Sequence, residues 1–327
     1  MTKLPESRGP LSAGLNEALL GRGPLPSPGD LHPFGEDATI ALHTMYELHY
    51  AGFDGVDAAW EWDPDLLRLR AALEKDFVEA LRDGVTTPSL DEALDALLVE
   101  VVPGDGVSHH LRDHGDREQM REYFAHRSVY HHKEADPHAW VIPRLRGQAK
   151  ASLVAVEFDE FGGGRGDRMH SRLYADLLAA AGLSAEYLHY LDNVPAPAIA
   201  IVNMMSLFGL HRSLRGALVG HFAAAEITTA PSAARMLQAL ERLDAPPACK
   251  LFFSEHVEAD AVHEQIMRRD VIGDLLAREP ELTADVVFGI QATELLEARL
   301  ADHLLSSWRS GSTSLRMRRR WLVSQNG

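Results

Sequence analysis

Three residues in the segment FFSEHVEADAVHEQI could bind a metal ion. His256, Asp260 and His263 stand at positions i, i+4 and i+7. In a helix, which turns about 100° per residue, Asp260 and His263 would lie within about 40° of His256. Two imidazoles and a carboxylate aimed at one neighbour are typical of metal sites inside helix bundles. The alternative interpretation is that these residues are surface polar groups on an acidic helix.

A second cluster flanks a glycine-rich break in the segment VEFDEFGGGRGDRMHSRLY. Glu160 precedes the break and His170 follows it. On one straight helix these side chains would face different directions, whereas a distorted turn at the glycines would let them converge. A phosphate-binding loop is the weaker alternative, because the sequence predicts no preceding strand and has no Gly-Lys-Ser/Thr ending.

Two further carboxylates stand in contexts that leave their roles open. Glu226 lies in the largely apolar segment GHFAAAEITTAPS, where burial of a carboxylate is costly unless it is paired or binds a metal. Glu226 could equally be a partly exposed residue at a helix end before Pro231. Glu134 lies three residues before Pro137, which would distort the local backbone and could turn a side chain inward.

Composition narrows the classes of function. Cys249 is the only cysteine, so an intramolecular disulfide and a thiolate metal site are excluded, and a metal must bind to His, Asp or Glu. Imidazole mixed with carboxylate favours iron or manganese. The formal net charge of −16 disfavours nucleic acid and anionic membrane surfaces as partners. We find no Gly-x-Ser-x-Gly elbow and no HExxH motif, so neither a serine hydrolase nor that class of zinc protease is indicated.

The elements that must position these residues are all predicted to be helices. Helical periodicity covers residues 148–160, 167–182, 196–227, 231–243, 252–277 and 280–308. Proline and glycine are dense in residues 22–36, which predicts a flexible N-terminal arm over 1–36. Residues 310–327 are predicted to be a basic tail around Arg316, Arg318, Arg319 and Arg320. No signal peptide or membrane span is evident, so we expect a cytoplasmic protein.

The chain resembles the haem-oxygenase-like diiron oxidases and oxygenases, often called iron-containing redox enzymes. The resemblance covers most of residues 40–305 and is most specific in the H-x3-D-x2-H spacing of His256, Asp260 and His263. Other matching stretches are YELHYAGFDGVDAAWEWDPDLL, KEADPHAWVIPRLRGQAKASLV, DEFGGGRGDRMHSRLYADLL and NMMSLFGLHRSLRGALVGHFAAAE. The resemblance implies an all-α, seven-helix, haem-oxygenase-like bundle over residues 121–309 that binds two irons, preceded by a helical extension over 37–120.

The resemblance also implies a set of iron ligands. They are Glu134, Glu160, His170, Glu226, His256, Asp260 and His263. Among them, Glu160, Glu226 and Asp260 are the carboxylates expected to act in catalysis. The ten-residue spacing of Glu160 and His170 is more similar to the N-oxygenase branch of the family than to the branch that makes alkenes from fatty acids.

The motifs and this resemblance together imply an enzyme that activates dioxygen at two iron ions. We expect N-oxygenation of an amine or guanidine of a small amino-acid-like substrate in natural-product biosynthesis, with an external electron donor. Oxidative C–C cleavage or desaturation at the same centre, and a non-enzymatic iron-binding protein, are the alternatives. A homodimer is one option for its assembly. The apolar segment 196–210, with Met204, Met205 and Phe208, could line a substrate pocket or form ordinary bundle core.

Overall fold

The computed structural model describes residues 2–99 and 103–316, apart from the side chains of residues 258–261. Every regular element in these ranges is a helix, which confirms the all-α prediction. None of the described helices is long and apolar enough to span a bilayer. The N-terminal elements are α1 (Pro10–Leu19), α2 (Glu36–Glu47), η1 (Ala58–Trp62), α3 (Pro64–Gly84), α4 (Leu90–Leu98) and α5 (Val107–Asp113).

The remaining helices form the haem-oxygenase-like bundle and its connections. The first half contains α6 (Arg117–His131), α7 (Asp136–Ala139), η2 (Ile142–Arg144), α8 (Gly147–Glu160), η3 (Gly162–Gly164) and α9 (His170–Ala180). The second half contains α10 (Ala196–Leu210), η4 (Arg212–Leu214), α11 (Arg215–Arg242), α12 (Pro247–Gln265), the π-helical η5 (Ile266–Ile272), α13 (Gly273–Arg278), η6 (Pro280–Leu282) and α14 (Thr283–Arg309).

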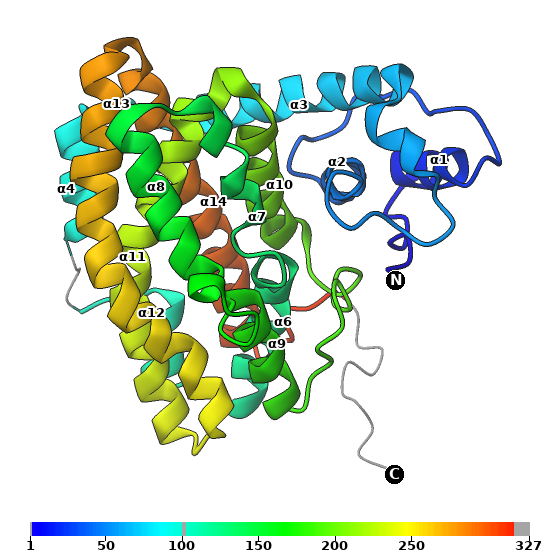
Figure 1. Ribbon diagram of the computed structural model, residues 1–327. Coiled ribbons are helices and arrows are strands. Elements are labelled where there is room, and N and C mark those ends of the chain that lie inside the picture. Colours follow the sequence, from blue (N-terminus) through cyan, green and yellow to red (C-terminus); the bar gives the residue numbers. More distant parts are fainter. Residues whose placement is uncertain (1, 100–102, 317–327) are drawn as a thin grey trace.

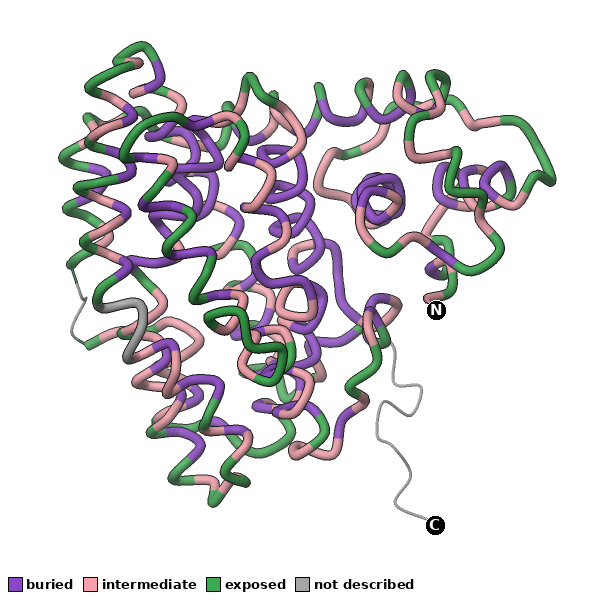
Figure 2. Tube along the Cα trace, viewed as in Figure 1, coloured by how far each residue is buried: buried purple, intermediate pink, exposed green. Residues whose placement is uncertain are grey.

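Figure 1 shows how these helices are arranged. The long helices α11, α12 and α14 run side by side, and α11 packs against both of the others. Helices α6 and α9 pack against each other at the end of the bundle where α12 begins, while α3 extends from the bundle toward α1 and α2. Buried residues face the centre of the bundle and exposed residues lie outside it, as Figure 2 shows.

Several helices begin where the sequence provides a capping residue. Asp63 accepts hydrogen bonds from the backbone N–H groups of Asp65 and Leu66 at the start of α3. Ser89 and Asp116 cap α4 and α6 in the same way, each with a capping box completed three residues later. Such side-chain acceptors satisfy backbone donors that have no partner within the helix, so these helix starts could be read from the sequence.

Two glycines allow α11 and α14 to approach closely. A Cβ atom at Gly220 would overlap the carbonyl group of Val286, and one at Gly289 would overlap the carbonyl group of Ala217. The backbones of the two helices therefore touch at a crossing where side chains normally separate them. His221 and Thr293 lie just beyond these glycines, on the facing sides of the two helices.

The prediction of a flexible arm over residues 1–36 is wrong for residues 10–19. These residues form α1, and Leu11, Leu15 and Leu19 are buried. Their spacing of four places them on one helix face, which packs against α2. The carboxylate of Asp37 accepts hydrogen bonds from the N–H groups of Leu11 and Ser12, at 2.9 and 2.8 Å, so α2 supplies the cap that α1 lacks.

The helix predicted over 196–227 is interrupted, and the break predicted before Pro231 is absent. Helix α10 ends at Leu210, where the guanidinium group of Arg144 donates to the carbonyl groups of Gly209 and Leu210. Helix α11 then continues through Pro231. A proline inside a helix costs roughly 3 kcal/mol. Burial of Ile227 and Met236 on either side of Pro231 offsets this cost.

The predicted basic tail begins with residues that are packed on the bundle. Ser314 is buried, and its N–H and Oγ groups both donate to the carboxylate of Glu122. Arg316 forms an ion pair with Glu36. Arg318, Arg319 and Arg320 lie outside the described residues.

Candidate metal centre

Six of the seven predicted ligands come together in two buried groups. Glu134, Glu160, His170 and His256 form the first group, and in each group the candidate ligand atoms lie within 4.8 Å of one another. The second group contains Glu160, Glu226 and His263. Glu160 belongs to both groups, as a carboxylate that bridges two metal ions would.

The glycine-rich turn after α8 brings Glu160 and His170 together. Gly162, Gly163 and Gly164 have φ angles of 68°, 63° and 81°, in the left-handed region that favours glycine. The turn reverses the chain, so Oε2 of Glu160 lies 2.8 Å from Nδ1 of His170. Burial alone would lower the pKa of His170, because it disfavours the charged imidazole. The carboxylate of Glu160 outweighs burial, so the pKa of His170 is raised. The expected convergence across the break is thus observed.

The contact between His170 and Glu160 is close without being a well-aligned hydrogen bond. Nδ1 of His170 has no hydrogen-bond partner among the described residues, although Oε2 of Glu160 is 2.8 Å away. Two buried side chains of the types that bind metals lie against each other here, as two ligands of one metal ion do. The site therefore fits a metal ion on its geometry as well as on its residue types.

A backbone carbonyl fixes the orientation of His256. Nδ1 of His256 lies 2.7 Å from the carbonyl oxygen of Phe252, one turn earlier on α12. A carbonyl can only accept, so Nδ1 carries a proton and Nε2 is the nitrogen that could bind a metal. Nε2 lies 3.8 Å from Oε1 of Glu134. The hydrogen bond to Phe252 orients the ring so that Nε2 of His256 lies toward the first group. Histidine ligands of metals are usually oriented by such a bond from the other ring nitrogen.

Glu134 is oriented by a histidine that the sequence analysis did not single out. Nδ1 of His131 lies 2.8 Å from Oε2 of Glu134, three residues later in the chain. Burial would raise the pKa of Glu134, but the adjacent His131 holds it well below its usual range. Glu134 is therefore a carboxylate in the folded protein. In the sequence, the only indication of a role for His131 is that it stands three residues before Glu134. That spacing became informative only after Glu134 was assigned to the site.

In the second group, His263 lies between two carboxylates. Nδ1 of His263 is 3.0 Å from Oε2 of Glu226, and Nε2 is 3.1 Å from Oδ2 of Asp159. Although burial opposes it, the hydrogen bond and charge of Glu226 raise the pKa of His263 to about 9. Glu226 is buried inside α11, so the alternative of an exposed helix-end residue is wrong. The side chain of Asp159 is 57% exposed, which places this group close to solvent.

Another carboxyl group lies one turn before Glu160 on α8. Glu157 is buried, and neither of its oxygens has a hydrogen-bond partner among the described residues. Burial, followed by the charges of Glu160 and Glu226, raises the pKa of Glu157 to about 9. Glu157 therefore carries a proton at neutral pH.

Asp260 lies on α12 between His256 and His263, but its side chain is outside the described part of the structure. Its role as the seventh ligand and as a catalytic carboxylate stays a prediction.

A cavity of about 500 Å³ adjoins the candidate ligands. Glu134, Glu160, Glu226 and His256 form part of its lining. The rest of the lining comes mainly from α4, α6, α11 and α14 and includes both polar and apolar groups. These other lining residues include Tyr123, Arg127, Tyr130, His138, Met205, His221, Phe222, Phe252, Thr293, Glu294 and Glu297. Its volume and its mixture of polar and apolar groups suit a small polar organic molecule.

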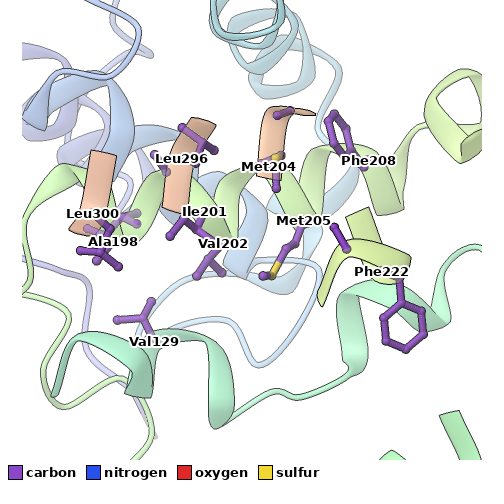
Figure 3. Close-up of a cluster of buried hydrophobic side chains, with 14 of the residues drawn as sticks. Val129, Ala198, Ile201, Val202, Met204, Met205, Phe208, Phe222, Leu296 and Leu300 are labelled. Atoms are coloured by element: carbon purple, nitrogen blue, oxygen red, sulfur yellow. The ribbon is translucent and has the colours of Figure 1, made fainter. Parts of the chain in front are cut away.

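The expected contribution of segment 196–210 to this cavity is observed for one residue. Met205 lines the cavity, while Met204 and Phe208 are fully buried core residues. Figure 3 shows all three on α10, together with Phe222, which also lines the cavity. His138 and His221 are cavity residues that the sequence analysis did not assign to the site. No spacing in the sequence links them, because they come from α7 and α11.

Comparison with known proteins identifies a relative and a family. The chain is 24% identical over 238 residues to a nitrosourea synthase of Streptomyces achromogenes subsp. streptozoticus, an alignment that covers 70% of this chain. This chain spans about half of that relative's length, since the alignment covers 50% of the relative. A family model described as iron-containing redox enzyme matches residues 121–298, which include the six predicted ligands with described side chains and Asp260 as well. The chain therefore belongs to the iron-containing redox enzyme family.

Proposed function

We propose that this protein is a diiron oxygenase that uses dioxygen to oxidise a nitrogen atom of a small amine or guanidine. The observation that carries the proposal is the position of Glu160, which belongs to both buried ligand groups and also lines the cavity. One carboxylate shared by two groups supports a pair of metal ions, and its exposure to the cavity supports a reaction with a bound molecule. Iron storage would require the ligands but no cavity shaped for an organic substrate.

The chain's own residues prepare the site in three ways. Hydrogen bonds from His131 to Glu134 and from His256 to Phe252 fix the directions of two ligands before a metal binds. Glu157 holds a proton on its carboxyl group beside the second ligand group. Met205, Phe222 and Phe252 provide apolar walls that would hold a substrate and exclude water from the centre.

Iron bound to this mixture of imidazoles and carboxylates would supply the electrons and the open coordination positions needed to activate dioxygen. For a primary amine the overall reaction is R–NH2 + O2 + 2e− + 2H+ → R–NHOH + H2O. One oxygen atom enters the product as an N–O bond and the other leaves as water. Two electrons must come from outside the substrate, so the proposal includes an external electron donor.

Nitrogen is the preferred site of oxidation for two reasons. The relative is a nitrosourea synthase, named for a product with a nitroso group on nitrogen. The cavity also contains Glu294 and Glu297 in addition to the ligand carboxylates, and this acidic lining suits a basic, nitrogen-containing molecule. Glu297 is paired with the charged Arg127, whereas Glu294 accepts a hydrogen bond from the neutral amide of Gln291, so Glu294 is the carboxylate better placed to meet a substrate amine.

The test is a product analysis on protein loaded anaerobically with Fe(II). Candidate amines, guanidines and short carboxylic acids are added with a chemical reductant and 18O-labelled dioxygen, and oxygen uptake and products are measured. We expect uptake that depends on one substrate class and one 18O atom bonded to nitrogen in the product.

Other outcomes separate the alternatives. Loss of a carbon fragment or formation of a C=C bond would replace N-oxygenation with oxidative cleavage or desaturation at the same centre. Oxygen uptake that no added compound changes, with ferric oxide as the end product, would show an iron-storage protein.

A further inference from the structure

Two buried histidines form a polar patch in the cavity outside the ligand groups. His138 and His221 are each 1% exposed, and their ring centroids lie 5.2 Å apart. Both side chains line the cavity. Nε2 of His221 and both ring nitrogens of His138 have no hydrogen-bond partner among the described residues. Buried polar atoms are normally paired, so three ring nitrogens without a partner, on two residues that line one cavity, point to a bound molecule.

The hydrogen bonds of Thr293 determine which nitrogen of His221 carries the proton. Oγ1 of Thr293 lies 2.7 Å from the carbonyl oxygen of Gly289 and 2.8 Å from Nδ1 of His221. A carbonyl oxygen has no proton to offer, so the single hydroxyl proton of Thr293 is donated to Gly289. The contact with His221 is then a hydrogen bond only if Nδ1 of His221 donates to Thr293. Nε2 of His221 is left with a lone pair, as a hydrogen-bond acceptor.

His221 and His138 are both uncharged in this environment. Burial lowers the pKa of His221 to about 4. Burial, followed by the neighbouring His221, lowers the pKa of His138 well below its usual range. The ring of His138 stacks on that of Phe222, with centroids 4.1 Å apart and planes at 16°, which limits its rotation. The patch is thus a rigid, neutral pair of imidazoles and cannot attract a ligand by charge.

We propose that His221 is a positioning residue, whose Nε2 accepts a hydrogen bond from an N–H group of the substrate while the ring of His138 forms the adjacent wall. The inference rests on the proposed function and deepens it, because it assigns a directional contact to the substrate nitrogen. A lone pair on Nε2 gains a bond from an N–H donor and repels the lone pair of an ether or carbonyl oxygen. A molecule that lacks any N–H or O–H donor would leave this acceptor buried and unpaired, which lowers its affinity.

The first test measures the protonation of the ring without any substrate. In metal-free protein labelled with 15N in its histidine rings, the His221 signals are assigned as those that disappear in His221→Phe. Long-range 1H–15N spectra should show a protonated Nδ1 and a bare Nε2. Thr293→Val keeps the shape of the side chain but removes the hydroxyl acceptor. In this variant the preference for a proton on Nδ1 of His221 should weaken. Protonation at Nε2 in the wild-type protein would overturn the proposal.

The second test compares two probes that differ in N–H groups. Butylamine, protonated at neutral pH, and the butyltrimethylammonium ion have the same charge and the same butyl chain, but only the first donates N–H hydrogen bonds. Dissociation constants are measured anaerobically by calorimetry on iron-loaded protein. We expect the wild-type protein to bind butylamine more tightly, and His221→Phe to weaken butylamine about fivefold while changing the other probe less than about twofold.

Two further variants separate hydrogen bonding from packing. His221→Gln presents an amide oxygen and should recover part of the affinity for butylamine. His126→Phe removes a buried histidine that bonds to Ser314 and does not line the cavity, and it should leave both probes unchanged. Equal weakening of both probes in His221→Phe, or no preference for butylamine in the wild-type protein, would show that His221 is only a packing residue.

The iron content of every variant is measured in the same preparations. If His221→Phe retains wild-type iron while its preference for butylamine is lost, the proposal about His221 stands. If the wild-type protein fails to bind iron, the proposed function fails, whereas the ring protonation measured in metal-free protein still decides the role of Thr293 and His221.

Discussion

Oε2 of Glu160 and Nδ1 of His170 lie 2.8 Å apart, although ten residues separate them in the sequence. The connection between them contains three consecutive glycines with positive φ angles. The candidate metal site thus depends on a surface turn as well as on the interior of the bundle, because this turn reverses the chain between α8 and the first residue of α9. The exposed turn is visible in Figure 2 at the end of α8.

Two glycines of this turn should respond differently to alanine. Gly162 has a φ angle of 68°, and a Cβ atom there would lie 2.5 Å from the backbone carbonyl carbon of Arg168. Gly162→Ala should therefore lower the free energy of unfolding by about 1–2 kcal/mol and weaken iron binding. A Cβ atom at Gly166 would meet no other atom within 4 Å, so Gly166→Ala is the matched control and should change neither quantity. Urea denaturation and iron titration measure both effects; equal behaviour of the two variants would contradict the role given to the turn.

Glu160 should matter for both metal positions, whereas His263 should matter for one. Glu160→Gln removes a charged ligand from both groups, and His263→Ala removes a ligand from the second group only. We expect iron content per chain, measured after anaerobic reconstitution and desalting, to fall most in Glu160→Gln and by about half in His263→Ala. Glu264→Gln, on the same helix but paired with Arg268 outside both groups, is the control. Equal losses in the two ligand variants would contradict a shared carboxylate.

The stability of the metal-free protein should depend on pH through His126. Burial, followed by the electrostatic effects of the neighbouring His303 and Arg127, lowers the pKa of His126 to about 3. The unfolded chain, in which the pKa is about 6.5, therefore binds a proton that the folded chain rejects. The free energy of unfolding therefore decreases as pH falls from about 6.5 toward 3. His126 contributes up to roughly 1.4 kcal/mol per pH unit to this decrease.

His126→Gln isolates this contribution, because glutamine can still bond to Ser314 but does not titrate. Urea denaturation between pH 5 and 7.5 should show a shallower loss of stability on acidification in the variant than in the wild-type protein. Parallel pH profiles would show that His126 is not the buried neutral group described above.

The buried ion pair that adjoins Glu134 in the chain should be important for stability. Nζ of Lys133 lies 2.6 Å from Oε2 of Glu47, and both side chains are almost completely buried. Lys133→Met would leave Glu47 buried without its counter-charge, which should cost about 3–5 kcal/mol. Lys75→Met, which breaks an exposed pair with Glu79 at 3.8 Å, should cost less than about 0.5 kcal/mol. Thermal or urea denaturation compares the two; a similar small loss in both would contradict the structural role of Lys133.

The all-α fold and the cluster on α12 could be predicted from the sequence because helical spacing is a local property, whereas the full set of ligands was implied only by the resemblance to a family. The spacing of His256 and His263 on α12 needs no knowledge of the rest of the chain. Glu226 was ambiguous, since burial depends on which helices pack around it. The interruption at Gly209 and Leu210 was missed because its cause, the guanidinium group of Arg144, comes from a distant segment. His138 and His221 were missed for the same reason, as their proximity exists only in three dimensions.

The contact of α11 and α14 at Gly220 and Gly289 bears on how this cavity could be re-engineered. Exchange of cavity-lining side chains such as Met205 and Glu294 would change the shape or charge of the molecule that the cavity can hold. The two glycines set the distance between the helix axes, and with it the alignment of His221 with Thr293. A side chain at either glycine would push the helices apart and disturb the hydrogen bonding of His221 without altering any cavity-lining residue. Libraries aimed at new substrates should therefore vary the lining and keep these two positions as glycine.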